Sequence, residues 1–212
     1  MAIQETYPIT AGANALYDFV DIANGSGVQV YYGCKTAQAT YILTGQTVYS
    51  NYVATTVIQT PAVENVFEKF NDKDFDVLIN RPMAIQGAAL IEVPFVWGEV
   101  ATSYGSQGYT IVNLSYVRGG VETSIVAGTG GYPASAQTPS LHSLTIPLTV
   151  LKRGDTLRLT VEGWVMSQHG PTVSCFGQIG HDPMNRLEAG TYDFTVSSVL
   201  KLRLPVRIEV ET

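Results

Sequence analysis

The chain has 212 residues, of which 45% are hydrophobic and only 14% are charged, against a usual charged share of about 25%. Its formal net charge of −6 argues against a nucleic-acid partner, because phosphate contacts need clustered lysine and arginine. No apolar stretch is long enough to span a bilayer, so the sequence predicts no membrane partner. The surplus of uncharged polar residues is expected of a surface that is largely covered by neighbouring proteins or that must avoid fixed ion pairs.

The N-terminal residues and the two cysteines both bear on where the protein is made. The first twelve residues contain neither a positively charged segment nor an apolar one, so the sequence predicts no signal peptide and synthesis in a cytoplasm. Cys34 and Cys175 lie far apart and form no CxxC motif, which makes a zinc site improbable. Two free, buried thiols are favoured over a disulfide, and both alternatives stay open.

Residues 1–60 are predicted to form a small N-terminal β unit. Runs of β-prone residues at 16–22 and 28–32 flank the turn-forming segment 24–27, which favours a hairpin. A unit of this size has little core of its own, and tyrosine is enriched at protein interfaces, so we expect its aromatic residues to dock on a larger partner. The alternative is that they are ordinary sheet residues. The predicted docking residues are Tyr17, Phe19, Tyr31, Tyr32, Tyr41, Tyr49 and Tyr52.

Residues 61–73 are predicted to link this unit to a second domain. Val63, Val66, Phe67 and Phe70 have helical spacing, which is compatible with one or two helical turns. An irregular connector fits the same residues equally well.

Residues 74–212 are predicted to form an antiparallel β-sandwich or jelly roll. Strands are expected at 75–79, 88–97, 109–118 and 121–127, and the last two are joined by the hairpin signal Gly119–Gly120.

The last third of the chain alternates apolar and polar residues most regularly. Residues 144–150 and 157–161 alternate in this way around the turn 152–155, and this pattern predicts a second hairpin. A final strand at 200–210 contains Pro205, which lacks a backbone N–H, so it should lie at a sheet edge or in a bulge.

Residues able to support catalysis or metal binding are few. His142, His169 and His181 are the only histidines, and His169, His181 and Asp182 lie in one long loop, 168–190, where they could surround a metal or act as a base with its orienting group. Their spacing matches no ligand pattern, which favours loop residues that bind nearby backbone. We therefore predict no cofactor, no metal, no catalytic residue and no enzyme activity.

Two short acidic motifs have stronger structural than functional explanations. Asp72, Asp74 and Asp76 alternate and could bind calcium, but no other oxygen-rich loop supports such a site. Arg153, Gly154 and Asp155 spell a tripeptide that integrins recognise, and glycine and aspartate equally suit the dihedral angles of a turn.

The whole pattern resembles that of known virus-particle proteins. Segment 148–161, a strand followed by a Gly-Asp turn and another strand, together with the long closing strand, resembles the jelly-roll domains of viral head fibres, decoration proteins and the tumour-necrosis-factor/C1q-like trimers. Segment 17–27, with residues 31–33 and 41–44, is similar to the leading segment of tailed-phage auxiliary capsid proteins.

This resemblance implies a virion structural protein. It would be a capsid decoration protein made in the host cytoplasm, forming a homotrimer and binding the major capsid protein on the outside of the phage head. The alternative is a receptor- or glycan-binding tip of a head or tail fibre. In that case the distal-loop residues Tyr132, His169, His181 and Asp182 would contact the ligand. A separate alternative is a carbohydrate-binding module or lectin of a cellular protein, for which Tyr132 and Trp97 are the candidate aromatic residues.

Overall fold

The computed structural model describes residues 15–16, 26–100, 105–130, 139–187 and 197–207. In this part of the chain every regular element is a strand apart from one 3-10 turn, which confirms the predicted all-β class. None of these residues forms a helix long and apolar enough to cross a membrane. The elements are β1 (Ala15–Leu16), β2 (Ser26–Lys35), β3 (Tyr41–Thr44), β4 (Ala54–Gln59), β5 (Glu68–Leu78), β6 (Met83–Val93), β7 (Phe95–Glu99), β8 (Ser106–Arg118), β9 (Val121–Thr129), β10 (Ser140–Leu151), β11 (Thr156–Ser167), η1 (Gly170–Thr172), β12 (Cys175–Gly180) and β13 (Lys201–Arg207).

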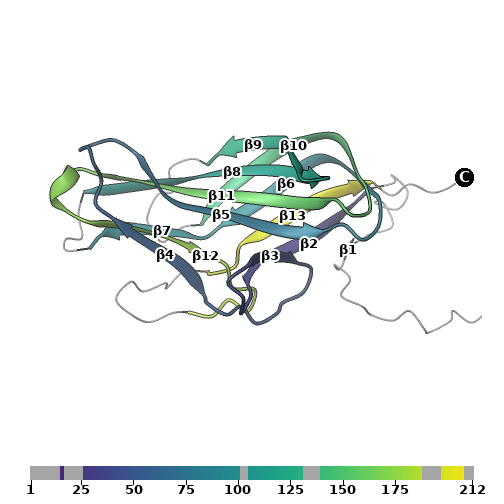
Figure 1. Ribbon diagram of the computed structural model, residues 1–212, viewed down its shortest axis with the longest axis horizontal. Helices are drawn as coiled ribbons and strands as arrows, with labels where there is room; N and C mark the ends of the chain where they lie inside the picture. The colour runs from purple at the N-terminus through teal and green to yellow at the C-terminus, as the bar shows by residue number, and fades with distance from the viewer. Residues whose placement is uncertain (1–14, 17–25, 101–104, 131–138, 188–196, 208–212) are drawn as a thin grey trace, which may run out of the picture.

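The strands form one large sheet and one small sheet (Figure 1). The order in the large sheet is β10-β6-β13-β2-β3-β5-β11-β8-β9, and β1 pairs with β2. Every pair in it is antiparallel except β3 with β5, which is parallel. The small sheet, β4-β12-β7, is antiparallel, and the chain enters it from β6 through Pro94.

The large sheet folds over on itself, so that its two end strands, β9 and β10, lie side by side. The imidazole of His142 on β10 makes a 2.8 Å hydrogen bond with the hydroxyl of Thr110 on β8, which ties the two halves together. One hydrophobic core fills the space between the halves and extends to the small sheet. It includes Phe75, Ile91, Leu114, Leu159, Leu202 and Ile179, none of which is measurably exposed.

The predicted division of the chain at residue 60 does not appear in the strand pairing. β2 pairs with β13, from the far end of the sequence, and β3 pairs with β5. The strands of the predicted N-terminal unit are therefore members of the large sheet. Within the predicted linker 61–73, residues 61–67 form neither helix nor strand, and β5 begins at Glu68.

The predicted hairpin around residues 152–155 is wrong, although both of its strands exist. β10 pairs with β6, whereas β11 pairs with β5 and β8, so the turn carries the chain from one half of the sheet to the other. Leu144 on β10 and Leu157 on β11 belong to the same core. Alternation marks the buried face of a strand but not its partner. The predicted hairpin at Gly119–Gly120 does form, between β8 and β9.

The final strand is central rather than at an edge, because β13 lies between β6 and β2. Pro205 is accommodated by an irregularity in the pairing of β13 with β6, between Arg203 and Val206. On β6, Gly87 faces Pro205 with a φ of +119°, a backbone conformation that residues with a side chain rarely adopt. Of the two predicted positions for Pro205, a sheet edge or a bulge, the structure shows the bulge.

Candidate functional site

Three aromatic side chains lie on the outer face of the large sheet, where β5 and β8 begin and β11 ends. Trp164 on β11 stands directly opposite Tyr109 on β8, and their rings are nearly parallel, with centroids 6.1 Å apart and planes at 10°. Phe67, just before β5, meets the Tyr109 ring edge-on at 4.9 Å. All three residues are half-buried, so part of each remains accessible. We refer to these three residues as the aromatic stack.

A charged cluster adjoins the aromatic stack. The indole N–H of Trp164 donates a 2.9 Å hydrogen bond to Glu162 Oε2, which fixes the ring against the sheet. The Lys69 ammonium lies 2.7 Å from Asp72 Oδ2 and 3.1 Å from Glu162 Oε1. These hydrogen bonds to Asp72 and Glu162 raise the pKa of Lys69. One ammonium therefore offsets part of the charge of two carboxylates beside the rings.

A second ion cluster continues along the same face. The Arg158 guanidinium binds both carboxylate oxygens of Asp76, at 2.8 and 2.9 Å, and also contacts Glu122 at 3.0 Å. Thr160 donates a 2.6 Å hydrogen bond to Asp74. The aspartates considered as calcium ligands are thus engaged with Lys69, Arg158 and Thr160. Among the described residues, no three metal-ligating side chains are grouped to hold an ion.

An acid–imidazole pair lies beyond the stack, where β7 and β11 end. His169 Nδ1 is 3.1 and 3.2 Å from the two carboxylate oxygens of Glu99, whose side chain is fully buried. Ser167 donates a 2.8 Å hydrogen bond to the same carboxylate. The His169 side chain is half exposed, so this pair is open to solvent on one side. An accessible imidazole hydrogen-bonded to a carboxylate is an arrangement suited to proton transfer.

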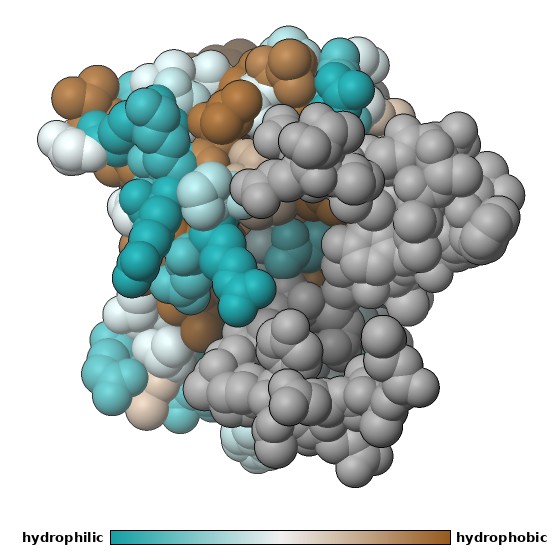
Figure 2. Space-filling view, turned by 90° about the vertical axis from the view of Figure 1, so that its right-hand side faces the viewer, coloured by the Kyte–Doolittle hydropathy of each residue, from teal (hydrophilic) through white to brown (hydrophobic). Residues whose placement is uncertain are grey.

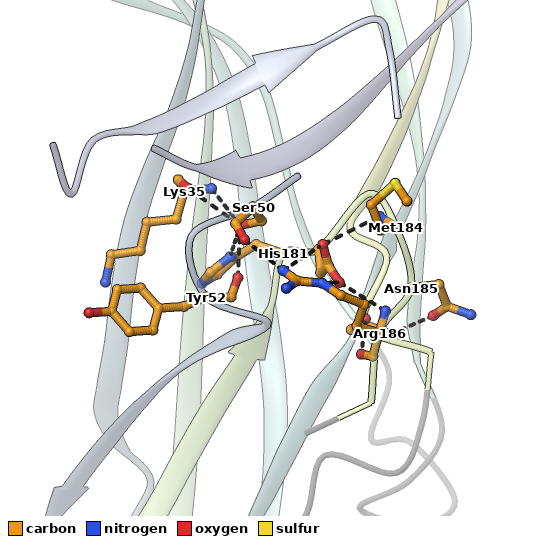
Figure 3. A network of polar contacts seen from close by, with 9 residues as sticks. Lys35, Ser50, Tyr52, His181, Met184, Asn185 and Arg186 are labelled. Carbon is orange, nitrogen blue, oxygen red and sulfur yellow. Dashed lines mark hydrogen bonds and ion pairs between the residues drawn. The ribbon is translucent and has the colours of Figure 1, made fainter. Parts of the chain in front are cut away.

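A buried polar network connects the segment before β4 to the turn after β12 (Figure 3). His181, Asp182 and Ser50 have no exposed surface. Asp182 accepts hydrogen bonds from the backbone and guanidinium of Arg186, both at 2.8 Å, and Arg186 in turn donates to the Ser50 carbonyl at 2.6 Å. His181 Nε2 lies 2.8 Å from the Thr55 hydroxyl. The network fixes both segments against the core.

This serine, histidine and aspartate are not arranged as a nucleophile with its base. The Ser50 hydroxyl donates to the Tyr52 carbonyl at 2.7 Å, whereas its distance to His181 Nδ1 is 3.4 Å. The Asp182 carboxylate is bound to Arg186 rather than to the imidazole. Burial lowers the pKa of His181 to about 4, so the ring is neutral at pH 7. A structural role accounts for every one of these contacts.

The predicted distal-loop site is not assembled. His181 and Asp182 are buried in the network above, whereas His169 belongs to the separate pair with Glu99. Tyr132 lies outside the described residues. Trp97, considered for a lectin-like site, is only 8% exposed and stacks on Phe95 in the core.

The predicted docking aromatics differ in their burial. Tyr31 is a core residue, and burial raises its pKa to about 12. Tyr41 packs against the core and makes a 2.8 Å hydrogen bond with Thr55, while Tyr32 is half-buried. Tyr49 and Tyr52 are 73% and 52% exposed, and these two could contact a partner. Tyr17 and Phe19 lie outside the described residues.

The sequence interpretation missed the aromatic stack, although one signal pointed to it. Side chains alternate along β11, and Trp164 lies on the same outward side as Arg158, Thr160 and Glu162. A large aromatic residue is unexpected among these polar ones. Tyr109 belongs to a strand 55 residues earlier by number, and only the register of β8 against β11 makes it the neighbour of Trp164. No local pattern encodes that register.

Comparison with known proteins shows a likeness of fold. No protein-family model and no curated protein matches the chain. An α-amino acid ester hydrolase matches with a TM-score of 0.54 and 13% identity, over 84% of this chain and 36% of the hydrolase. An aminopeptidase from the marine sediment archaeon Thaumarchaeota archaeon has a TM-score of 0.48 at 8% identity, over 84% and 37% of the two chains. A structure of infectious bursal disease virus has a TM-score of 0.25 at 10% identity, over 87% and 48%.

The likeness to the α-amino acid ester hydrolase corrects the prediction that the chain is not an enzyme. That prediction relied on the small number of histidines and on a spacing that matches no ligand pattern, yet this fold occurs within a hydrolase. The chain spans about a third of the length of the hydrolase and the aminopeptidase that it matches. At 13% identity the likeness concerns the fold, and no residue role is transferred with it.

Proposed function

We propose that the chain is a structural protein of the virus-particle surface, a decoration protein that binds the outside of a capsid. One observation carries the proposal. Four apolar side chains, each between 54% and 67% exposed, gather at the end of the molecule that holds the turns 119–120 and 152–155. We call them the apolar rim, and they are Leu78, Val121, Leu148 and Val150.

Two strands of the apolar rim, β9 and β10, lie side by side, whereas β11 and β8 separate β5 from β9. Arg118, whose backbone pairs with Val121, donates a hydrogen bond to the Val150 carbonyl at 3.2 Å. Figure 2 looks onto this end of the molecule and shows hydrophobic residues along its top, the side of β9 and β10 in Figure 1. Several exposed apolar side chains at one end of a protein favour a site that another protein covers.

Two exposed tyrosines offer a second contact. The Arg186 guanidinium lies 3.8 Å from the centre of the Tyr49 ring, and the Lys35 ammonium lies 4.5 Å from that of Tyr52. Cation–π contacts of this kind hold an exposed ring in position. Tyrosine and arginine are the residues most often found at the energetic centre of protein interfaces. A capsid subunit and two further copies of the chain, as in a homotrimer, are the proposed partners.

The test combines solution mass with capsid binding. Light scattering of the purified chain should give three times its mass of 22.9 kDa, and the protein should rebind source-virus capsids stripped of accessory proteins. A Val121→Ser/Val150→Ser variant should lose one or both properties. Leu141→Ser is the matched control, because Leu141 is 71% exposed on the same β10 strand but belongs outside the rim. A monomer that does not bind capsids contradicts the proposal.

The fold likeness favours a second candidate function, that of a domain in an ester hydrolase. It is supported by the TM-score of 0.54 to an α-amino acid ester hydrolase and by the pair of buried Glu99 and half-exposed His169. The measurement is release of the alcohol from an α-amino acid ester by the purified chain. Hydrolysis above the rate of heat-denatured protein, lost in His169→Ala, supports this candidate. A rate equal to that of the denatured protein contradicts an ester-hydrolysing site on this chain.

A further inference from the structure

We propose that the aromatic stack is a carbohydrate-binding site for neutral sugars. The site lies on the strand face formed by β5, β11 and β8, not in the loops, and it is independent of capsid docking. Its components are the Phe67, Tyr109 and Trp164 rings, with Lys69, Asp72 and Glu162 beside them.

The rings provide an apolar surface that is already in place. Trp164 is fixed by its hydrogen bond to Glu162, and Tyr109 is held between Trp164 and Phe67. A ligand therefore meets side chains whose conformational freedom is already lost, which lowers the entropic cost of binding. The C–H-rich face of a pyranose is the kind of weakly apolar surface that packs on such rings, while the tyrosine hydroxyl and indole edge remain polar.

The adjoining charges supply hydrogen bonds to hydroxyl groups. Asp72 and Glu162 are acceptors, and Lys69 is a donor, all on the same outward face as the rings. Hydrogen bonds that involve an ionised group are about twice as strong as those between neutral groups. An aromatic surface with donors and acceptors at its edge matches a sugar, which has one apolar face and a rim of hydroxyls.

The charge pattern selects against other ligands that stack on aromatic rings. Nucleic-acid bases bring phosphates, and these would face Asp72, Glu162 and the further carboxylates of Asp74 and Asp76 on the same face. A quaternary ammonium ion favours an aromatic site with unpaired carboxylates. Here Lys69 already lies 2.7 and 3.1 Å from the two nearest carboxylates. A neutral ligand with many hydroxyl groups fits this balance best.

The experiment starts with the purified chain on an array of neutral and acidic oligosaccharides, followed by titration of the best binder. Trp164→Ala and, separately, Tyr109→Ala should weaken binding about tenfold, the loss expected for one aromatic contact. Trp164→Phe should retain part of the affinity because a ring remains. Leu141→Ala is the control, since Leu141 is an exposed apolar residue outside both the stack and the apolar rim.

A measurement on the unaltered protein guards against variants that fail to fold. The chain has two tryptophans, and Trp97 is only 8% exposed, so a sugar bound at the stack should change the fluorescence of Trp164 selectively. No binding to any neutral sugar overturns the proposal, as does binding that both alanine variants retain while folded. Preference for acidic sugars or for a single-stranded oligonucleotide overturns the assigned ligand class. All these readouts use the free chain, so they are distinct from the capsid test.

Discussion

Asp155, the last residue of the tripeptide that integrins recognise, is buried in this structure. Its side chain is 3% exposed, and the Arg118 guanidinium binds both of its oxygens, at 2.9 and 2.6 Å. It also accepts a 2.7 Å hydrogen bond from the Lys152 backbone, which closes the turn. Gly154 within the turn has a φ of +91°. A tripeptide that integrins recognise needs an accessible aspartate. Because Asp155 is buried, the predicted turn explains this tripeptide.

The same contacts predict how Asp155 affects stability with pH. The hydrogen bond from Arg118 lowers its pKa to about 2, below the value of about 3.9 expected in the unfolded chain. The unfolded state therefore takes up the proton first, and the stabilisation is complete above about pH 4 and is lost as pH falls to about 2. Asp155→Asn should lower the melting temperature at pH 7 and flatten its pH dependence in this window.

Thermal unfolding followed by circular dichroism at several pH values measures both effects of Asp155→Asn. Glu64→Gln is the control, because Glu64 is an exposed carboxylate. A variant with the melting temperature and acid sensitivity of the unaltered chain would show that the ion pair contributes nothing.

For the strands, the sequence predicts which face is buried better than it predicts which strands pair with each other. The alternation of residues 157–161 correctly marks which side of β11 is buried, because burying every second side chain produces that pattern. The partner of each strand depends on long-range geometry. β3 and β5 pair in parallel, and β2 pairs with β13, and neither arrangement leaves a turn signal between the paired segments. The aromatic stack was missed for the same reason, since it is formed by register.

The bulge in β6 yields a prediction at this scale. Gly87 has a φ of +119°, and pairing of β6 with both β10 and β13 shifts near it. Gly87→Ala should lower the free energy of unfolding by about 1–3 kcal/mol, because an alanine is strained in this conformation. Urea unfolding measures the change. Ala88→Ser, at the exposed neighbouring position, should have little effect, and equal losses in both variants would contradict the argument from backbone strain.

For the molecule as a whole, two buried histidines predict a loss of stability in weak acid. Burial lowers the pKa of His142 and of His181 to about 4. Both titrate near 6.5 in the unfolded chain, so that state gains protons first as the pH falls. The free energy of unfolding should be insensitive to these groups above about pH 6.5. Between pH 6.5 and 4 it should fall by up to about 1.4 kcal/mol per pH unit for each histidine.

Urea unfolding at pH 7 and pH 5 measures this dependence. A His142→Gln/His181→Gln variant should be less stable at pH 7 but should lose less on acidification than the unaltered chain. His169→Gln, at a half-exposed position, serves as the comparison. An unchanged slope in the double variant would assign the acid sensitivity to other groups.

The central position of β13 has a consequence for synthesis. β13 fills the gap between β6 and β2, so residues 26–35 and 83–93 lack a neighbour on that side until residues 201–207 leave the ribosome. Translation proceeds at about 5–20 residues per second, so the interval between the synthesis of β6 and that of β13 lasts on the order of ten seconds. During it, two long apolar strands present open edges to other nascent chains. Efficient production of this protein should therefore depend on chaperones and on low crowding of polysomes.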